Sequence, residues 1–137
     1  MTLLIQIINR ILEYSANDNN YDFLIAGDLN GRVSVLPDYI VNDNITYLPL
    51  SRDVYDPDES TINVRYNEDT VVNEHGRKVL EMCKMCGLRI ANGRVGNPIQ
   101  SGAKTFIGQP GSSTIDLIIC SPAFFSKLEK LSILPIT

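Results

Sequence analysis

The stretch Phe23-Leu24-Ile25-Ala26-Gly27-Asp28-Leu29-Asn30-Gly31-Arg32 runs from four apolar residues straight into Gly-Asp-x-Asn-Gly. A short, continuous apolar run that ends in turn residues predicts a strand buried on both faces. Asp28 and Asn30 then lie at the end of that strand, which is where open α/β folds usually bind ligands. The same residues also favour an ordinary turn, because Asp, Asn and Gly adopt turn conformations readily. From these ten residues alone, both interpretations stay open.

The composition is that of a globular protein with one modest core. The chain has 137 residues, of which 44% are hydrophobic and 20% are charged. Its net charge of −4 provides no overall basic field that would attract nucleic acid, although a local patch or a bound cation can still do so. The apolar start ends at Asn9, so it is too short to span a bilayer, and it lacks the features of a signal peptide. We therefore expect an intracellular protein without a membrane segment.

The hydrophobic pattern predicts an α/β fold. Apolar residues at helical spacing predict a helix over 3–14, and the buried strand over 21–26 follows it, as in half of a β-α-β repeat. A second helix is expected from Asn73, which can cap its first turn, to Met85, before Gly87. Further strands are expected over 88–93, 104–107 and 114–120, with a tight turn over 108–113 and a helix start at 121–123.

Residues 31–72 are the least regular part of the chain. We expect a long surface loop there, with brief extended pieces at 45–48 and 62–64. Its middle carries an acidic cluster, which is typical of a solvated loop and consists of Asp53, Asp56, Asp58 and Glu59.

Asp116 is the one charged residue inside the apolar run 114–120. A carboxylate buried in a strand is costly unless it is paired or hydrogen-bonded, so Asp116 needs a partner. A structural hydrogen bond to nearby amides or hydroxyls and a functional role are both open.

The cysteines and the basic residues are weaker candidates. Cys83 and Cys86 have C-x-x-C spacing, but they lie at a helix end and no second pair exists to complete a zinc site, so core packing is the better interpretation. With Cys120 they are too few for a disulfide framework, which favours a reducing compartment. The only histidine, His75, is interpreted as a surface residue at a helix start. Three cations could face a phosphate backbone or simply belong to a normal surface: Arg32, Arg94 and Lys104.

Four motifs, in this order along the chain, resemble the endonuclease/exonuclease/phosphatase superfamily. Gly27-Asp28-Leu29-Asn30 resembles its Gly-Asp-Phe/Leu-Asn motif, and Ser113-Thr114-Ile115-Asp116-Leu117-Ile118 looks like its Ser-x-Ile-Asp-Tyr-Ile motif. Between them, Asn73-x-x-Gly76-x-x-x-Leu80-x-x-Cys83 and Leu88-x-Ile90-Ala91-Asn92-Gly93-Arg94 resemble the branch found in endonuclease–reverse transcriptase proteins of non-LTR retrotransposons. The resemblance extends from the first helix to about Ile133.

The resemblance implies a partial domain. Residues 1–137 would form the C-terminal half of a DNase I-like, four-layer α/β/β/α sandwich, without the family's N-terminal half and without its final Asp-His segment. The inner face of the sheet would then lack the second sheet that normally covers it, so we expect aggregation or partner association at that face.

The resemblance also implies a chemistry, which is Mg²⁺- or Mn²⁺-dependent hydrolysis of phosphodiesters, with DNA as the substrate of the complete domain. Asp28 would orient and deprotonate the attacking water, and Asn30 would donate to the phosphate or align the nucleophile, both beside the metal. Asp116 would hold a catalytic histidine in one orientation. That histidine and the family's metal-binding glutamate have no counterpart here. The alternative is therefore an inactive remnant of a retrotransposon endonuclease, at most a binding module.

Overall fold

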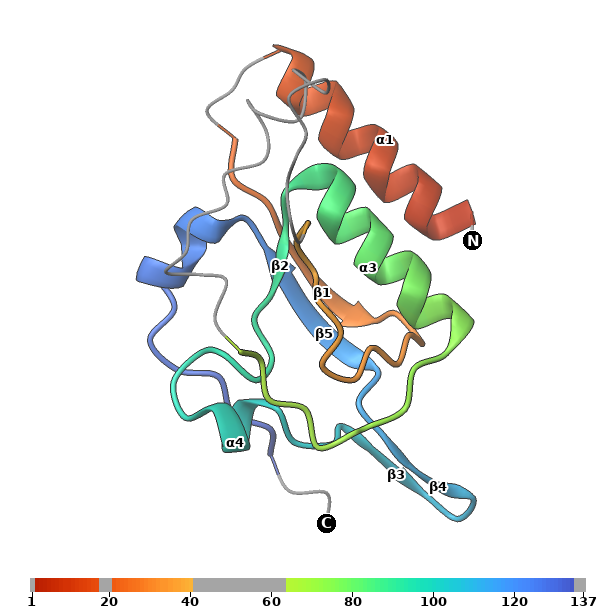
Figure 1. Ribbon diagram of the computed structural model, residues 1–137. Helices are drawn as coiled ribbons and strands as arrows, with labels where there is room; N and C mark the ends of the chain where they lie inside the picture. The colour runs from red at the N-terminus through yellow and green to blue at the C-terminus, as the bar shows by residue number, and fades with distance from the viewer. Residues whose placement is uncertain (1, 18–20, 41–63, 135–137) are drawn as a thin grey trace.

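A three-stranded antiparallel sheet carries two helices on one of its faces, and a separate two-stranded hairpin projects from it (Figure 1). The computed structural model describes residues 2–17, 21–40 and 64–134. In chain order the elements are α1 (Thr2–Asn17), β1 (Leu24–Asp28), α3 (Glu74–Cys86), β2 (Arg89–Ile90), α4 (Pro98–Ser101), β3 (Phe106–Gly108), β4 (Gly111–Ser113), β5 (Asp116–Cys120) and the 3₁₀ helix η1 (Pro122–Ser126).

The main sheet has the strand order β1-β5-β2, and β5 pairs antiparallel with both neighbours. The combination of helices with strands agrees with the α/β expectation at this coarse level. Every strand pair among the described residues is antiparallel. The β-α-β repeat expected around the first helix stays a prediction, because none of these pairs joins β1 to a strand that precedes α1.

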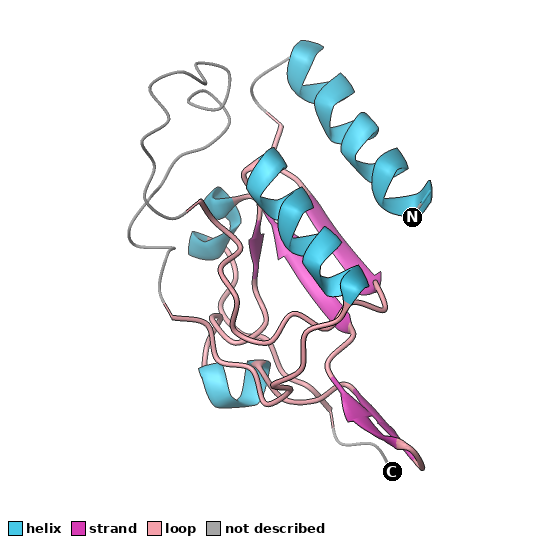
Figure 2. Ribbon diagram, turned by 45° about the vertical axis from the view of Figure 1, so that its right-hand side comes forward, coloured by secondary structure: helices cyan, strands magenta, loops and turns pink. Residues whose placement is uncertain are grey.

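The prediction that the 23–26 strand is buried on both faces is also wrong. Leu24 is 48% exposed, and Ala26 and Asp28 are exposed as well. Of the residues of β1, only Ile25 is partly buried. The physical reason is that β1 is an edge strand of the described sheet, and that α1 and α3 cover only one of its faces (Figure 2). The central strand is β5, whose Leu117 and Ile119 are buried.

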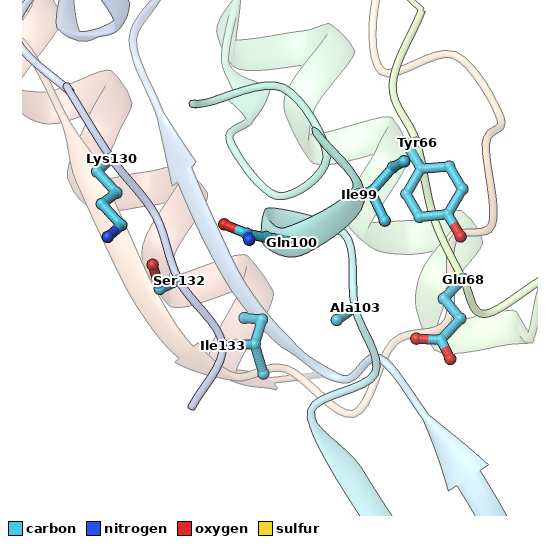
Figure 3. A pocket seen from close by; sticks show the side chains of 8 residues that line it. All are labelled: Tyr66, Glu68, Ile99, Gln100, Ala103, Lys130, Ser132 and Ile133. Carbon is cyan, nitrogen blue, oxygen red and sulfur yellow. The ribbon is translucent and has the colours of Figure 1, made fainter. Parts of the chain in front are cut away.

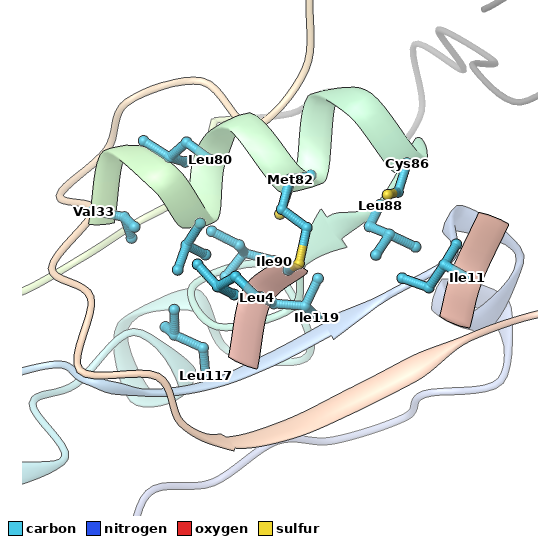
Figure 4. Close-up of a cluster of buried hydrophobic side chains, with 12 residues drawn as sticks. Leu4, Ile11, Val33, Leu80, Met82, Cys86, Leu88, Ile90, Leu117 and Ile119 are labelled. Atoms are coloured by element: carbon cyan, nitrogen blue, oxygen red, sulfur yellow. The ribbon is translucent and has the colours of Figure 1, made fainter. Parts of the chain in front are cut away.

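The core lies between α3, α1 and the sheet. Figure 4 shows the buried side chains between α3 and β5, and Leu4 and Ile11 of α1 belong to the same cluster. Leu4 and Ile11 of α1 are buried as the 3–14 helix prediction requires, whereas Leu12 is 47% exposed. Cys83 and Cys86 belong to this cluster, which confirms the core-packing interpretation.

The predicted caps of the second helix are both observed. The side chain of Asn73 accepts a hydrogen bond from the amide of Gly76 at 2.7 Å, and Gly87 ends the helix with a φ of 67°. Gly76 also permits a close approach, because a Cβ at this position would lie 1.9 Å from the carbonyl oxygen of Arg32. The first turn of α3 is therefore pressed against the chain just after Asn30.

The remaining expectations are met in part. The 88–93 strand shortens to β2, and the turn expected over 108–113 instead contributes β4 to a hairpin with β3. The short helix α4, capped by Asn97, was not predicted, and the helix start at 121–123 is a 3₁₀ helix. The extended piece at 45–48 and the acidic cluster of Asp53, Asp56, Asp58 and Glu59 lie outside the described residues, as do 62–63 of the second piece. Across the described segments, no helix has both the length and the apolar character needed to cross a membrane.

Candidate functional site

The register of β1 on β5 places Asp28 directly opposite Asp116. The amide of Leu29 donates to the carbonyl of Ile115 at 3.0 Å, which makes Leu29 and Ile115 a hydrogen-bonded pair. Asp28 and Asp116 are therefore the adjacent, non-hydrogen-bonded pair, whose Cα atoms lie about 4.5 Å apart in antiparallel sheets. Side chains of directly opposed residues point to the same face of the sheet, so the two carboxylates are neighbours at the end of the strand pair.

Asp116 is not the buried carboxylate that the apolar run predicted. It is the first residue of β5, and its side chain is exposed, while Leu117 behind it is buried. The strand begins two residues later than the apolar pattern suggested, which removes the burial cost. Two like charges that face each other directly are nevertheless destabilising without a counter-charge, so the pair favours a bound cation.

A tight turn fixes Asn30 beside Asp28. The amide of Asn30 donates to Oδ1 of Asp28 at 2.8 Å, and Asn30 has a φ of 53°, in the left-handed region that Asn tolerates. The turn interpretation of Gly-Asp-x-Asn-Gly is therefore correct, and it holds one carboxylate oxygen of Asp28 while leaving the other for a ligand.

Asn73 holds the end of the turn, at Asn30 and Arg32. Its side-chain oxygen accepts from the amide of Arg32 at 2.9 Å, and its side-chain nitrogen donates to the carbonyl of Asn30 at 3.4 Å. One residue thus caps α3 and anchors the turn that carries Asn30.

The backbone of Asp116 is held from two directions. Oγ1 of Thr105 accepts from the amides of Ile115 and Asp116, both at 3.1 Å. The side chain of Asn92 donates to the carbonyl of Asp116 at 3.1 Å and accepts from the amide of Ile118 at 2.8 Å. Asn92 was noted in the sequence only as part of a resembling motif, and its role as a strand support depends on the register, which the sequence does not reveal.

A buried aspartate, Asp69, was missed from the sequence and lies behind the site. Its carboxylate accepts from Nε and Nη2 of Arg32 at 2.9 and 2.8 Å, and from the amides of Thr114 and Val71 at 3.0 and 3.1 Å. Burial alone would raise the pKa of this carboxyl, but the hydrogen bonds from Arg32, Thr114 and Val71 outweigh it, so the pKa lies below its ordinary value.

These contacts decide the role of the three candidate cations. Arg94 cannot face a phosphate backbone, because its side chain is 6% exposed and donates to both carboxylate oxygens of buried Asp38 at 2.6 and 2.8 Å. Arg32 uses two nitrogens on Asp69 and keeps 29% of its side chain exposed. Lys104 donates to Oγ of Ser112 at 2.9 Å, at the base of the β3–β4 hairpin.

His75 lies on the first turn of α3 and is exposed, as predicted for a surface residue. It is the only histidine of the chain. The described residues therefore place no histidine on the sheet face that carries Asp28 and Asp116, and the resemblance's partner for Asp116 has no counterpart there.

A groove of about 660 Å³ lies elsewhere, between residues 66–68, α4 and residues 130–133 (Figure 3). None of Asp28, Asn30 and Asp116 lines it. The candidate site is thus an open surface at the end of two strands.

The residues present fit a weakly held divalent cation. Mg²⁺ is commonly bound through one or two carboxylates, with water and substrate phosphates completing its shell. Asp28 and Asp116 supply two carboxylates, and Asn30 adds a neutral amide on the adjoining turn. No group of three or more histidine, cysteine, aspartate or glutamate side chains suited to a metal exists in the described segments 2–17, 21–40 and 64–134.

The chain was compared with family models, with curated proteins and with solved structures, and none of the three comparisons found a match.

Proposed function

We propose that this chain carries part of the active site of a DNase I-like, metal-dependent phosphodiesterase domain whose substrate is DNA. The observation that carries the proposal is the register that brings Asp28 and Asp116 together, since the two residues lie 88 positions apart in the sequence. They are the acidic residues of the two motifs that resemble the family. A chance resemblance gives no reason for the two carboxylates to meet on one face of one strand pair.

Beside its contact with the cation, each residue has one task in the proposed chemistry. A Mg²⁺ or Mn²⁺ ion at this site would supply charge neutralisation for the phosphoryl oxygens. Asp28, fixed on one oxygen by the amide of Asn30, accepts the proton of the attacking water through its other oxygen. The water oxygen forms the new bond to phosphorus as the bond to the leaving oxygen breaks, and the side-chain amide of Asn30 donates to the phosphate.

Asp116 is assigned to hold the group that protonates the leaving oxygen, by analogy with buried aspartates in hydrolase triads. The described residues place no histidine beside it that could act as this proton donor. Cleavage of DNA, whose leaving alkoxide needs that proton, is therefore expected to fail in this chain alone. An activated diester, whose nitrophenolate leaves without protonation, still reports water activation by Asp28.

This difference separates the proposal from the inactive-remnant alternative. The 137-residue chain is incubated with Mn²⁺ and either bis(p-nitrophenyl) phosphate or supercoiled plasmid. We expect slow, metal-dependent hydrolysis of the activated diester, reduced about 100-fold or to background by Asp28→Asn, and no nicking of the plasmid. If the parent chain does not hydrolyse the activated diester, or if Asp28→Asn hydrolyses it equally fast, the inactive-remnant alternative is favoured. Plasmid nicking that disappears in the variant shows instead that the site is complete.

We also propose that the sheet face bearing the carboxylates meets a further protein layer, as the sandwich resemblance implies. Leu24 and Ala26 of β1 are exposed on the face that the helices do not cover. On the β5 side, Cys120 is buried against Phe124, Phe125, Leu128 and Leu131. The described chain thus covers one part of this face and leaves the β1 part open.

A further inference from the structure

Asp69 binds both chain segments that carry the candidate carboxylates. Its side chain is 1% exposed and accepts four hydrogen bonds. Two come from Arg32, which follows Asp28 by four residues and Asn30 by two. A third comes from the amide of Thr114, two residues before Asp116. The fourth comes from the amide of Val71 in its own segment.

These bonds act where the sheet stops. The hydrogen bond between Leu29 and Ile115 is the last backbone bond of the β1–β5 ladder, and it lies just beyond the two carboxylates. Past it, the chain after β1 and the chain before β5 diverge into a turn and a hairpin. The Asp69 carboxylate bridges them there, from inside the protein, with one oxygen bonded to both Arg32 and Thr114.

Asp69 is itself held in place. Its amide donates to the side-chain oxygen of Asn67 at 2.9 Å, and the side-chain nitrogen of Asn67 donates to the carbonyl of Ser34 at 3.0 Å. The carboxylate cannot follow one strand end without pulling on the other, because each of its oxygens already has two donors.

We propose that Asp69 is a positioning residue that sets the separation of Asp28 and Asp116. This inference rests on the proposed function for its purpose, but its geometry can be measured without any activity. The competing explanation is that Asp69 is one more buried ion pair that stabilises the fold and has no special effect on the site.

Asp38 provides a matched control for that explanation. It is also fully buried, it also accepts two bonds from one arginine, Arg94, and it also accepts a backbone amide, that of Ile90 at 2.7 Å. Its partners belong to β2 and the turn that follows, and none lies on the strand ends at Asp28 and Asp116. Asp38→Asn therefore removes a comparable pair at a different place.

The test is disulfide formation in the full 137-residue chain with Asp28→Cys and Asp116→Cys introduced together. Both positions are exposed, and the spacing of a non-hydrogen-bonded pair, about 4.5 Å between Cα atoms, lies within the range that a disulfide spans. The rate of closure with diamide reports how often the two positions meet. Thermal unfolding and near-ultraviolet circular dichroism report whether each variant keeps its fold.

We expect Asp69→Asn to slow closure about tenfold or more, and Asp38→Asn to change it less than twofold at a similar loss of thermal stability. Closure at the parent rate in Asp69→Asn, or equal slowing by both variants, overturns the proposal. If Asp69→Asn does not fold, Arg32→Gln decides. This variant removes two of the four bonds from a partly exposed side chain, so slower closure supports the proposal and an unchanged rate overturns it.

The proposed function can fail separately. Mn²⁺ binding is measured by electron paramagnetic resonance on the 137-residue chain that keeps Asp28 and Asp116, with and without Asp69→Asn. Loss of outer partners typically weakens metal binding 10- to 100-fold. If Asp69 controls closure but the parent binds no Mn²⁺, the positioning role stands and the metal-dependent function fails. If the parent binds Mn²⁺ but Asp69→Asn does not change the rate of disulfide closure, the metal-dependent function stands and the positioning role fails.

Discussion

Asp28 and Asp116 are candidate site residues because they lie directly opposite each other in the β1–β5 strand pair. Neither carboxylate is buried, so neither is held by the low-dielectric interior. What fixes them is backbone geometry: an Asx turn on Asn30 for the first, and hydrogen bonds from the amides of Ile115 and Asp116 to Thr105 for the second. Two opposed like charges with fixed backbones destabilise each other without a counter-charge, and this is why we propose that a cation binds here.

The buried thiols are predicted to be inert. Burial raises the pKa of Cys86 and of Cys120 to about 11, and it raises the pKa of Cys83 further. A higher pKa leaves less thiolate at neutral pH, so all three should react slowly with a disulfide reagent at pH 8 and rapidly in denaturant. Elemental analysis should find no stoichiometric zinc. Fast labelling of the folded chain, or zinc that leaves only on unfolding, would contradict the packing role.

At the scale of elements, α3 approaches the segment after Asn30 closely. Glycine inside a helix usually costs stability, and replacing it with alanine usually gains about 1 kcal/mol. At Gly76 the sign reverses, because the new Cβ would lie 1.9 Å from the carbonyl oxygen of Arg32. This contact places the helix start against the turn that carries the site.

We therefore predict that Gly76→Ala lowers the free energy of unfolding by about 2–3 kcal/mol, measured by urea titration. Glu81→Ala, at an exposed position of the same helix, is the control and should change it by less than about 0.5 kcal/mol. A Gly76→Ala protein as stable as the parent would show that α3 does not approach Arg32 this closely.

The segment 64–69 shows why part of the fold could not be predicted. Val64 and Tyr66 are its apolar residues, and hydrophobicity alone would bury them rather than their polar neighbours. The structure does the opposite: Val64 is 93% exposed, while Arg65, Asn67 and Asp69 are buried. The polar side chains are inside because backbone carbonyls, a backbone amide and Arg32 satisfy them, and those partners come from 29 to 45 residues away in the chain. The local pattern of apolar and polar residues cannot predict partners this distant in the sequence.

Other elements were predictable because their causes are local. The caps at Asn73 and Gly87 and the apolar stripe of α3 depend on neighbours within one helix, and they are observed as expected. Asp28 and Asn30 were identified correctly as strand-end residues for the same reason. Their partnership with Asp116 was implied only by resemblance, since it depends on the β1–β5 register.

For the whole molecule, two buried aspartates make the free energy of unfolding depend on pH. Burial acts to raise the pKa of Asp38 and of Asp69, but the hydrogen bonds and charge of Arg94 and of Arg32 hold both pKa values below the ordinary value of 3.8. The unfolded chain therefore binds these protons more readily than the folded chain does. The stabilisation is fully present above pH 4–5, roughly, and is lost as the pH falls through the lower, folded pKa values.

We predict that the free energy of unfolding stays nearly level from pH 7 to about 5 and falls below about 4. Asp69→Asn and Asp38→Asn should each make that decline shallower while lowering stability at pH 7, as followed by urea unfolding at a series of pH values. A decline in either variant as steep as in the parent would show that the aspartate it replaces is not held in its ionised form.

The central claim is that the β1–β5 register builds a divalent-cation site from Asp28 and Asp116, and Mn²⁺ titration followed by electron paramagnetic resonance tests it most directly. We expect one bound Mn²⁺ per chain, with a dissociation constant of about 0.1–1 mM, as for oxygen sites with few charged ligands. Asp28→Asn and Asp116→Asn should each weaken binding about tenfold or more, while Glu81→Ala leaves it unchanged. Binding that is absent in the parent, or unaffected by both aspartate variants, would contradict the account.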